Sequence, residues 1–310
     1  MQGPPVAAID LGTKSILMVI GQRTEQGIGI IADEHAIVRL GEGVDAQGFL
    51  SQEAMDRACR QITVYAEIAR RLGVQTIAAW GTSALRDAVN RQVLIERVFN
   101  ESQIKLHPLS GDQEALLTFR GAQFGKNDPE HCTVIDIGGG STEIALGSPS
   151  HLQFSLSLDI GSVRLNERFF CQLPPNPKAL AKARKQVEAA LGTLPPIAPD
   201  LPLIAVSGTP LVLAALDKGK DRFNEPSLDG HYLHTERVRQ MSNELLEMDY
   251  SSLCSLSPIG SERADGIGAG GLILSTFLEQ CGLRGVCVSL RGLRYGLLER
   301  MVQASEERTA

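Results

Sequence analysis

Two short apolar runs, each followed by an aspartate and glycine, mark the start and the middle of the chain. Residues 6–9 are apolar, Asp10-Leu-Gly follows them, and a second apolar run covers 16–20. Short apolar runs separated by small polar residues predict a strand, a tight turn and a second strand. The N-terminal pattern therefore predicts a hairpin with a tip of small residues.

The same order of residues returns near the middle of the chain. A strand-like run at 133–135 precedes Asp136, then come three glycines and Ser-Thr, and Glu143 opens the next apolar run to 146. Each hairpin stands at the head of a segment in which strands and helices alternate. This repetition indicates a duplicated α/β fold in which two similar domains face each other across an active-site cleft.

The remaining periodicity completes this α/β pattern. A serine at position 51 can accept hydrogen bonds from the exposed amides of a helix that follows it. We place the first domain at 1–121 together with a C-terminal helix at 293–310, and the second at 122–292. Helices are predicted at 51–72, 87–100, 111–120, 162–170, 178–191, 234–248, 267–280 and 292–303, and further strands at 28–31, 76–80, 104–106, 203–206 and 285–289.

Composition narrows the class of protein. The 310 residues are 43% hydrophobic, enough for a buried core in each of two domains. The net charge of −6 argues against a broad surface for duplex nucleic acid. Six cysteines without CxxC or zinc spacing indicate reduced thiols. With no membrane-length apolar run and no leader before the first strand, we expect a cytoplasmic protein that does not bind a membrane.

The strongest chemical motif is the sequence from Asp136 to Glu143. Three successive glycines allow backbone amides to approach a phosphate closely, and the two hydroxyls that follow add donors. Strand-end carboxylates at Asp136 and Asp10 are suited to Mg²⁺, which prefers hard oxygen ligands. A glycine-rich turn with a capping aspartate has the same appearance. The predicted phosphate-binding residues here are Gly138, Gly139, Gly140, Ser141 and Thr142.

Two further loops are candidates for phosphate binding. The N-terminal tip supplies amides, two hydroxyls and an ammonium group, although a solvated turn lysine would look the same. A third contact is predicted after the strand 203–206, where a simple β-turn is the alternative. The candidates are Gly12, Thr13, Lys14 and Ser15 in the first loop, and Gly208 and Thr209 in the second.

Taken together, six motifs resemble the exopolyphosphatase and guanosine pentaphosphate phosphatase (Ppx/GppA) family, and the resemblance covers nearly the whole chain. It implies the actin/Hsp70/sugar-kinase type of fold, which is ribonuclease H-like, in a short two-domain form without the C-terminal helical module of longer members. It also implies a homodimer. Besides the two hairpins, the motifs are Gly81-Thr-Ser-Ala-Leu-Arg86, Gly111-Asp-Gln-Glu114-Ala, Glu262-Arg-Ala-Asp265 and Arg291-Gly-Leu-Arg-Tyr-Gly296.

The resemblance assigns roles that the residues alone leave open. It implies that Glu114 is the base that activates water, that Arg86 steadies a phosphate, and that Mg²⁺ (or Mn²⁺) lies near Asp10, Asp136 and Glu143. These groups suit phosphoryl transfer, which needs a positioned base and charge on the phosphate oxygens. From the residues alone, Glu114 is equally a charge at a helix N-terminus and Arg86 a surface ion pair.

Four positions depart from the family pattern. Lys14 replaces a more frequent Asn and adds a cation, whereas Leu17 replaces a basic or polar residue and removes a contact to a longer substrate. Leu290 and Tyr295 stand where acidic residues are common. Substrate choice is the property that these departures affect.

The expected activity is removal of the terminal phosphate of inorganic polyphosphate. The first alternative is the same reaction on guanosine pentaphosphate, which also ends in a phosphoanhydride. The second alternative is an ATP-dependent kinase or ATPase of the same superfamily. Such enzymes typically have a Gly-Gly loop that binds adenosine where this chain has Ala205-Val-Ser-Gly-Thr-Pro210, and this difference counts against them. A non-catalytic sensor of polyphosphate or of the nucleotide is the third alternative, although four acidic site residues argue against a pure polyanion binder.

Overall fold

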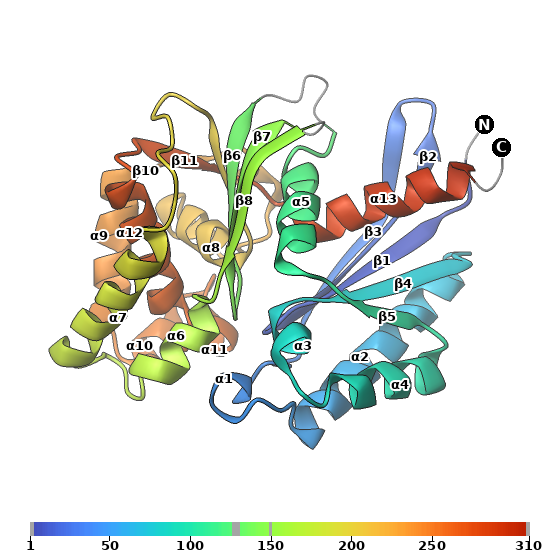
Figure 1. Cartoon of the computed structure of the whole chain (residues 1–310), viewed down its shortest axis with the longest axis horizontal. Helices are drawn as coiled ribbons and strands as arrows, with labels where there is room; N and C mark the ends of the chain where they lie inside the picture. The colour runs from blue at the N-terminus through green and yellow to red at the C-terminus, as the bar shows by residue number, and fades with distance from the viewer. Residues whose placement is uncertain (1–2, 126–130, 149–150, 308–310) are drawn as a thin grey trace. The chain divides into compact units, whose positions relative to one another are not determined.

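The chain forms two compact α/β units (Figure 1). The computed structural model describes residues 3–125, 131–148 and 151–307. Unit 1 comprises Met1–Asp128 and Arg291–Ala310, and unit 2 comprises Pro129–Leu290. Parts of the predicted leader-free N-terminus and domain ranges, at 1–2, 126–130, 149–150 and 308–310, lie outside the described residues.

Unit 1 is built on a five-stranded sheet of order β3-β2-β1-β4-β5. Strands β1, β2 and β3 are antiparallel neighbours, whereas β4 and β5 run parallel to β1. The predicted strand 28–31 was too short, because Asp33, Glu34 and His35 conceal the second half of an edge strand, where charges are common. The strands are β1 (Val6–Leu11), β2 (Ser15–Thr24), β3 (Gly27–Ile37), β4 (Thr76–Gly81) and β5 (Lys105–Pro108).

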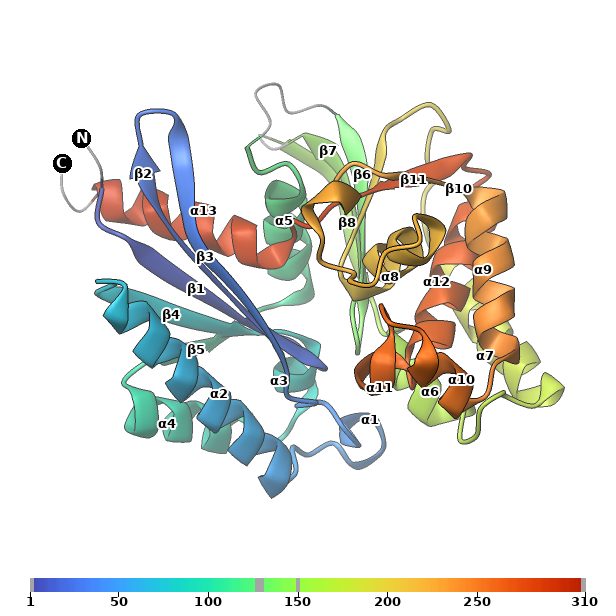
Figure 2. The ribbon, with the colours of Figure 1, turned by 180° about the vertical axis from the view of Figure 1, so that it is seen from behind.

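Helices cover both faces of this sheet, as Figures 1 and 2 show from opposite sides. Alternate residues of β1 divide between two cores: Ala7 and Ile9 pack with α2 and α4, whereas Val6 and Ala8 pack with α5 and α13. The helices are α1 (Val44–Gln47), α2 (Gln52–Arg71), α3 (Ser83–Asp87), α4 (Arg91–Ser102), α5 (Gly111–Ala122) and α13 (Leu293–Glu307).

Two sequence predictions in unit 1 meet different outcomes. Ser51 caps α2 as predicted, accepting a hydrogen bond from the Ala54 amide. The helix predicted at 87–100 is present as α4 but begins four residues later, at Arg91, and the short helix α3 before it was not predicted. Between them, Asn90 exchanges two 2.9 Å hydrogen bonds with the backbone of Leu50. A side chain that bonds a distant backbone in this way competes with helix continuation.

The C-terminal helix α13 lies against α5 at backbone contact. A Cβ atom at Gly121 would overlap the carbonyl of Gly292, and one at Gly296 would overlap the carbonyl of Leu117. Only glycine allows two helices to approach this closely. Residues from the start of the chain and from its helix α13 thus share the core on one face of the sheet.

An ion pair fixes the start of α13 to the edge strand β3. Both terminal oxygens of Asp33 accept hydrogen bonds from Arg294, at 2.8 and 2.9 Å. The Tyr295 hydroxyl donates to the same carboxylate at 2.7 Å. Burial, and then this hydrogen bond to Asp33, raises the pKa of Tyr295 to about 12. The phenol therefore stays a donor throughout the neutral range.

Unit 2 repeats the sheet of unit 1 and adds one strand. Its order is β10-β11-β9-β6-β7-β8. The segment β8-β7-β6-β9-β11 matches β3-β2-β1-β4-β5 in order and in the direction of every pairing. The predicted duplicated α/β fold is confirmed. The strands are β6 (Cys132–Ile137), β7 (Thr142–Ser148), β8 (His151–Leu158), β9 (Leu203–Val206), β10 (Tyr232–His234) and β11 (Gly285–Val288).

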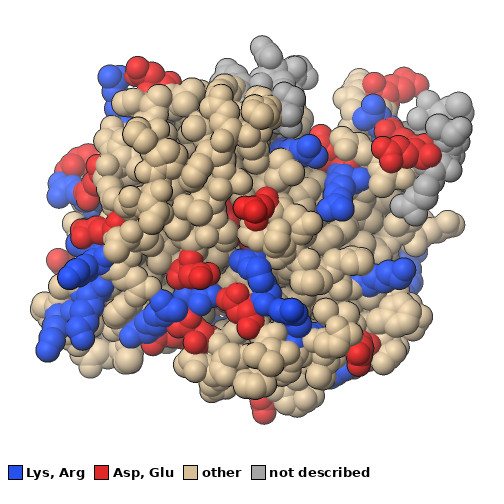
Figure 3. All heavy atoms as spheres, in the orientation of Figure 1, with Lys and Arg blue, Asp and Glu red and all other residues tan. Residues whose placement is uncertain are grey.

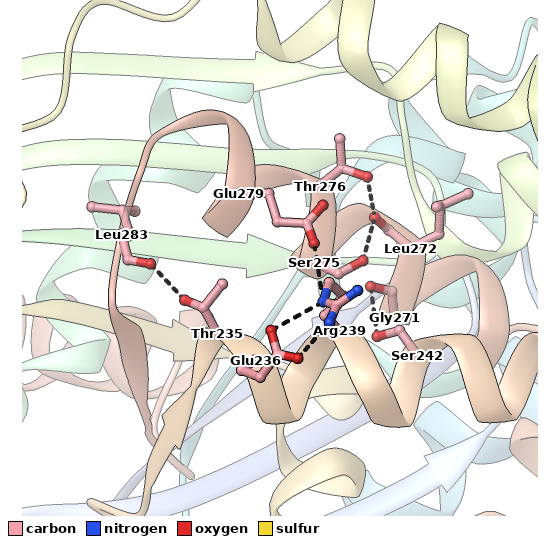
Figure 4. A network of polar contacts seen from close by, with 10 residues as sticks. All are labelled: Thr235, Glu236, Arg239, Ser242, Gly271, Leu272, Ser275, Thr276, Glu279 and Leu283. Carbon is pink, nitrogen blue, oxygen red and sulfur yellow. Dashed lines mark hydrogen bonds and ion pairs between the residues drawn. The ribbon is translucent and has the colours of Figure 1, made fainter.

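The core of unit 2 surrounds α12, in which every residue from 267 to 278 is buried. In Figure 4, Ser242 on α9 donates to the Gly271 carbonyl on α12, and Arg239 pairs with Glu236 and Glu279. The helices are α6 (Ser162–Phe169), α7 (Pro177–Leu191), α8 (Gly208–Asp217), the 3₁₀ helix η1 (Pro226–Leu228), α9 (Thr235–Glu247), α10 (Tyr250–Ser255), α11 (Gly260–Arg263) and α12 (Ile267–Gln280).

The surface carries charges of both signs. On the face shown in Figure 3, lysine and arginine side chains are interspersed with aspartate and glutamate. Across the described segments, no helix combines the length and the apolar character that crossing a membrane requires.

The α5–α13 contact gives a direct test of the fold. Gly121→Ala should lower the free energy of unfolding by about 3 kcal/mol, because the added methyl meets a backbone carbonyl that cannot move aside easily. Chemical denaturation of the full chain measures this. Gly192→Ala, at a helical φ of −64°, is the control with little expected effect. Equal stability of the two variants would contradict the close packing.

Candidate active site

The two predicted hairpin tips are equivalent turns. In unit 1 the Gly12 amide donates to the Ser15 carbonyl at 2.9 Å, and in unit 2 the Gly138 amide donates to the Ser141 carbonyl at 3.0 Å. The backbone of the first residue and of the fourth residue therefore closes each turn in the same way. The repeated sequence pattern reflects repeated backbone geometry.

In unit 2 the first turn of α6 holds the carbonyl side of the glycine turn. The Ser162 amide donates to the Gly138 carbonyl at 2.9 Å, and the amides of Val163 and Arg164 donate to the Gly139 carbonyl at 2.8 and 3.0 Å. A Cβ atom at Gly161 would overlap the Gly139 carbonyl, so the two backbones are in direct contact. Sequence analysis did not assign this supporting role to α6.

This support determines where the amides of the turn point. In a trans planar peptide the C=O of one residue and the N–H of the next point in opposite directions. Because the carbonyls of Gly138 and Gly139 face α6, the N–H groups of Gly139 and Gly140 face away from it. With Ser141, these amides have no hydrogen-bond acceptor among the described residues. They are free to bind an anion.

In unit 1 a loop before α1 holds the equivalent turn. The Gly41 amide donates to the Thr13 carbonyl at 2.8 Å, and the amides of Val38 and Arg39 donate to the Lys14 carbonyl at 3.0 and 2.8 Å. A Cβ atom at Gly41 would overlap the side chain of Thr13. Both turns are thus fixed from their carbonyl side.

Two carboxylates lie side by side in unit 2. Asp136 on β6 and Glu143 on β7 are opposite each other in register, so both side chains leave the same face of the sheet. Glu143 is buried, and its Oε1 accepts a hydrogen bond from the Ser157 hydroxyl at 2.7 Å. In unit 1, Asp10 lies opposite Leu17 instead.

This donor set suits magnesium better than a metal with an all-protein shell. No cluster of three or more His, Cys, Asp or Glu side chains able to hold a metal occurs among the described residues. Magnesium commonly uses one or two carboxylates and completes its shell with water and substrate phosphate. Asp136 and Glu143 fit that mode, and Asp10 is in unit 1.

The predicted base and the predicted phosphate-binding arginine are in contact in unit 1. Glu114 lies in the first turn of α5, behind a capping box made by Ser110 and Gln113. Its Oε2 accepts a hydrogen bond from Arg86 Nη1 at 2.9 Å, and the same nitrogen donates to the Leu109 carbonyl at 3.1 Å. The Glu114 side chain is 7% exposed and that of Arg86 24%.

The elements that carry these residues begin beside the strand-end aspartates. Asp10 is in register with Trp80 at the end of β4, and α3, which carries Arg86, starts two residues after that strand. In unit 2, Asp136 is in register with Val206, the last residue of β9. The duplication thus places a helix start next to each aspartate.

The third candidate loop is a helix start rather than a β-turn. Gly208 and Thr209 form the first turn of α8, a helix that sequence analysis missed. The β-turn alternative is therefore wrong. Ser207 precedes the helix with φ +84° and ψ 178°, a conformation that favours glycine. Thr209 is buried, so its side chain packs inside unit 2.

Equivalent sheets, each with a strand-end aspartate before a fixed amide turn, define a duplicated α/β protein of the actin-like fold. The chain belongs to the Ppx/GppA phosphatase family, whose model matches residues 19–305. The family resemblance predicted from the motifs is confirmed.

Three curated relatives each have a phosphatase activity in their names. The chain is 32% identical over 314 residues to Exopolyphosphatase 2 of Mycobacterium tuberculosis, covering 94% of this chain and 97% of the relative. It is 30% identical over 297 residues to the Bifunctional 3-dehydroquinate synthase/phosphatase of Fusobacterium nucleatum, covering 91% of this chain but only 44% of that protein. Identity to Guanosine-5'-triphosphate,3'-diphosphate pyrophosphatase of Vibrio campbellii is 26% over 303 residues, covering 96% of this chain and 59% of the relative.

A solved structure agrees with the assignment. The Aquifex aeolicus member of the Ppx/GppA family superimposes with a TM-score of 0.82 and 26% identity, covering 97% of this chain and 98% of the other. The predicted class, a hydrolase of phosphoanhydrides, is confirmed at this level by the family and the relatives.

The backbone at Ser207 offers a test of the site's local strain. Ser207→Gly should raise the free energy of unfolding by about 1 kcal/mol, because a non-glycine residue in a sparsely populated region costs about 1–3 kcal/mol and glycine loses part of that gain through its flexibility. Thermal unfolding of the two proteins measures this. A lower melting temperature for the variant would show that Ser207 is not strained.

Proposed function

We propose that this protein is an exopolyphosphatase that releases orthophosphate from the end of inorganic polyphosphate. The observation that carries the proposal is the Arg86–Glu114 pair, which joins a buried carboxylate to a cation that is partly exposed. The similarity to a protein named Exopolyphosphatase 2 over nearly all of both chains supports the same substrate class.

The phosphate end of the substrate is assigned to the amide turns. The N–H groups of Gly139, Gly140 and Ser141 carry partial positive charge and suit the oxygens of a phosphate. The tip of unit 1, with Thr13, Lys14 and Ser15, supplies further donors of the same kind. Gly12 and Gly138 close the two turns, and Thr142, Gly208 and Thr209 remain predicted contacts.

The metal is assigned to the strand-end carboxylates. We propose that Asp136 and Glu143, with Asp10, hold Mg²⁺ or Mn²⁺, which when bound neutralises charge on the phosphate oxygens. The Ser157 hydroxyl fixes the orientation of Glu143. Within unit 2, the carboxylates and the amide turn follow one another on the same hairpin, so metal and phosphate contacts come from one rigid element.

The role of accepting the proton of the attacking water is assigned to Glu114. As general base, its carboxylate orients a water molecule and accepts its proton while the water oxygen bonds to the terminal phosphorus and the bridging oxygen leaves. Arg86 holds this carboxylate in one orientation, and its remaining N–H groups can bind a phosphate oxygen. The ion pair therefore joins the proposed base to a cation that can bind phosphate.

Guanosine pentaphosphate is the second candidate substrate. It presents the same terminal phosphoanhydride, and the relative from Vibrio campbellii is named for a guanosine nucleotide. The homodimer and the cytoplasmic compartment stay predictions. Light scattering of the purified protein addresses the former.

Glu114→Gln should reduce turnover at least about a hundredfold, because general base catalysis contributes about 10²–10⁴-fold, while substrate binding persists. The measurement is orthophosphate release with Mg²⁺ from short and long polyphosphate, guanosine pentaphosphate and ATP. Asp112→Asn, an exposed carboxylate in the same helical turn, is the matched control.

Each result of that assay has a meaning. Polyphosphate hydrolysis that is lost in Glu114→Gln and kept in Asp112→Asn supports the proposal. Preference for the guanosine nucleotide promotes the second candidate. Wild-type rates in Glu114→Gln would show that Glu114 is not the base. If the wild-type protein releases no phosphate from any substrate, the non-catalytic sensor is the remaining alternative.

Asp136→Asn should raise the Mg²⁺ concentration for half-maximal activity by about tenfold, since changes near a metal commonly weaken its binding 10- to 100-fold. A magnesium titration of the initial rate measures this. Asp159→Asn, an exposed carboxylate that follows β8 in the same unit, should leave the titration unchanged. An unaltered titration in Asp136→Asn would count against its metal role.

A further inference from the structure

We propose that Arg164 is a positioning residue that directs the third amide of the unit 2 turn, that of Ser141, toward a bound phosphate. This inference rests on the proposed function, since it names the side chain on which the phosphate-binding turn depends.

The main chain of α6 supports only part of the turn. Its first amides hold the carbonyls of Gly138 and Gly139. The Gly140 carbonyl instead accepts a hydrogen bond from a side chain, Arg164 Nε, at 2.6 Å. Because the Gly140 carbonyl and the Ser141 N–H belong to one planar peptide, the arginine that fixes the former also fixes the direction of the latter.

Arg164 is well placed to do this because one residue contacts two consecutive peptides. Its own amide donates to the Gly139 carbonyl at 3.0 Å, which anchors its backbone on the turn. Nearby, the Thr142 hydroxyl donates to the Ile160 carbonyl at 2.6 Å and ties β7 to the segment that leads into α6. The backbone from which the guanidinium reaches Gly140 is therefore held in place.

The equivalent turn in unit 1 does without such a side chain. There the Lys14 carbonyl, which corresponds to that of Gly140, accepts from the main-chain amides of Val38 and Arg39. Glycine is also the more mobile residue at this position, because it lacks the Cβ that restricts φ and ψ. Unit 2 thus combines the more flexible turn with support from one replaceable side chain.

The charge of Arg164 adds to the geometry. Guanidinium is always protonated, and a charged donor on a carbonyl polarises the whole peptide. The N–H at the other end becomes a stronger donor to an anion. The ligand that this favours is a phosphate oxygen, either of the terminal phosphate of a chain or of free orthophosphate.

The test compares Arg164→Ala and Arg164→Lys with the wild type. Calorimetry in the Glu114→Gln background measures the binding of tripolyphosphate and, separately, of inorganic phosphate without turnover. We expect Arg164→Ala to bind tripolyphosphate about tenfold more weakly, in the range of a lost hydrogen bond to a charged group. Arg164→Lys, which keeps the cation and a donor, should recover part of the loss. Arg168→Ala, an exposed arginine on the same helix, is the control.

Steady-state kinetics of the same variants with an intact Glu114 separates positioning from folding. Arg164→Ala should raise KM for polyphosphate and leave the pH dependence of kcat unchanged, since the base is another residue. Unchanged tripolyphosphate binding in Arg164→Ala would overturn the inference, as would an equal loss in Arg168→Ala. If Arg164→Ala fails to fold, wild-type binding by Arg164→Lys overturns the inference and weaker binding supports it.

Failure of this inference and failure of the proposed activity give different results. Phosphate binding that depends on Arg164, in a protein that hydrolyses no phosphoanhydride, would remove the proposed function and keep the positioning role. Normal hydrolysis together with unaltered binding in Arg164→Ala would keep the proposed function and remove the positioning role.

Discussion

The planarity of the peptide bond is the constraint on which the candidate site depends. Each carbonyl of the glycine turn that accepts a hydrogen bond from α6 fixes the direction of the N–H on the other side of the same peptide. Hydrogen bonds between α6 and the carbonyls of the turn therefore fix the direction of the amides on its other side. Three glycines alone would form a flexible loop, and their arrangement as donors comes from the segment 161–164, which packs against them. The direction of the turn's amides is therefore set by the segment 161–164 and not by the glycines alone.

Duplication provided the same hairpin twice, and the two copies have since taken different residues. The turn of unit 1 keeps Lys14 where unit 2 has Gly140, and Leu17 where unit 2 has Glu143. The paired carboxylates belong to unit 2, whereas the partly buried Arg86–Glu114 pair belongs to unit 1. The two copies of one backbone thus carry different polar residues, because strand-end positions can change without disturbing the pairing of the sheet.

Local pattern was enough to predict the hairpins, most helices and the strand-end aspartates, since these depend on periodicity and turn residues. It was not enough where distant contacts decide. The break before α4 depends on Asn90 bonding to Leu50, and the edge strand β3 is concealed by its own charges. Strand β8 was overlooked although its leucines and Phe154 alternate with polar residues. The Arg86–Glu114 contact and the role of α6 join residues more than twenty positions apart, which no local pattern encodes.

The contact of α13 with α5 has a consequence for the order in which the protein is made. Unit 2 is one continuous stretch of chain, so all of its strands are present once residue 290 has been synthesised. Unit 1 precedes unit 2 along the chain but lacks the helix that covers Val6, Ala8 and Val19 until residues 293–307 have been synthesised. Domains generally fold as their chain emerges. Here the first unit to start is the last to finish, and its apolar face waits, uncovered by α13, through the synthesis of the whole of the other unit.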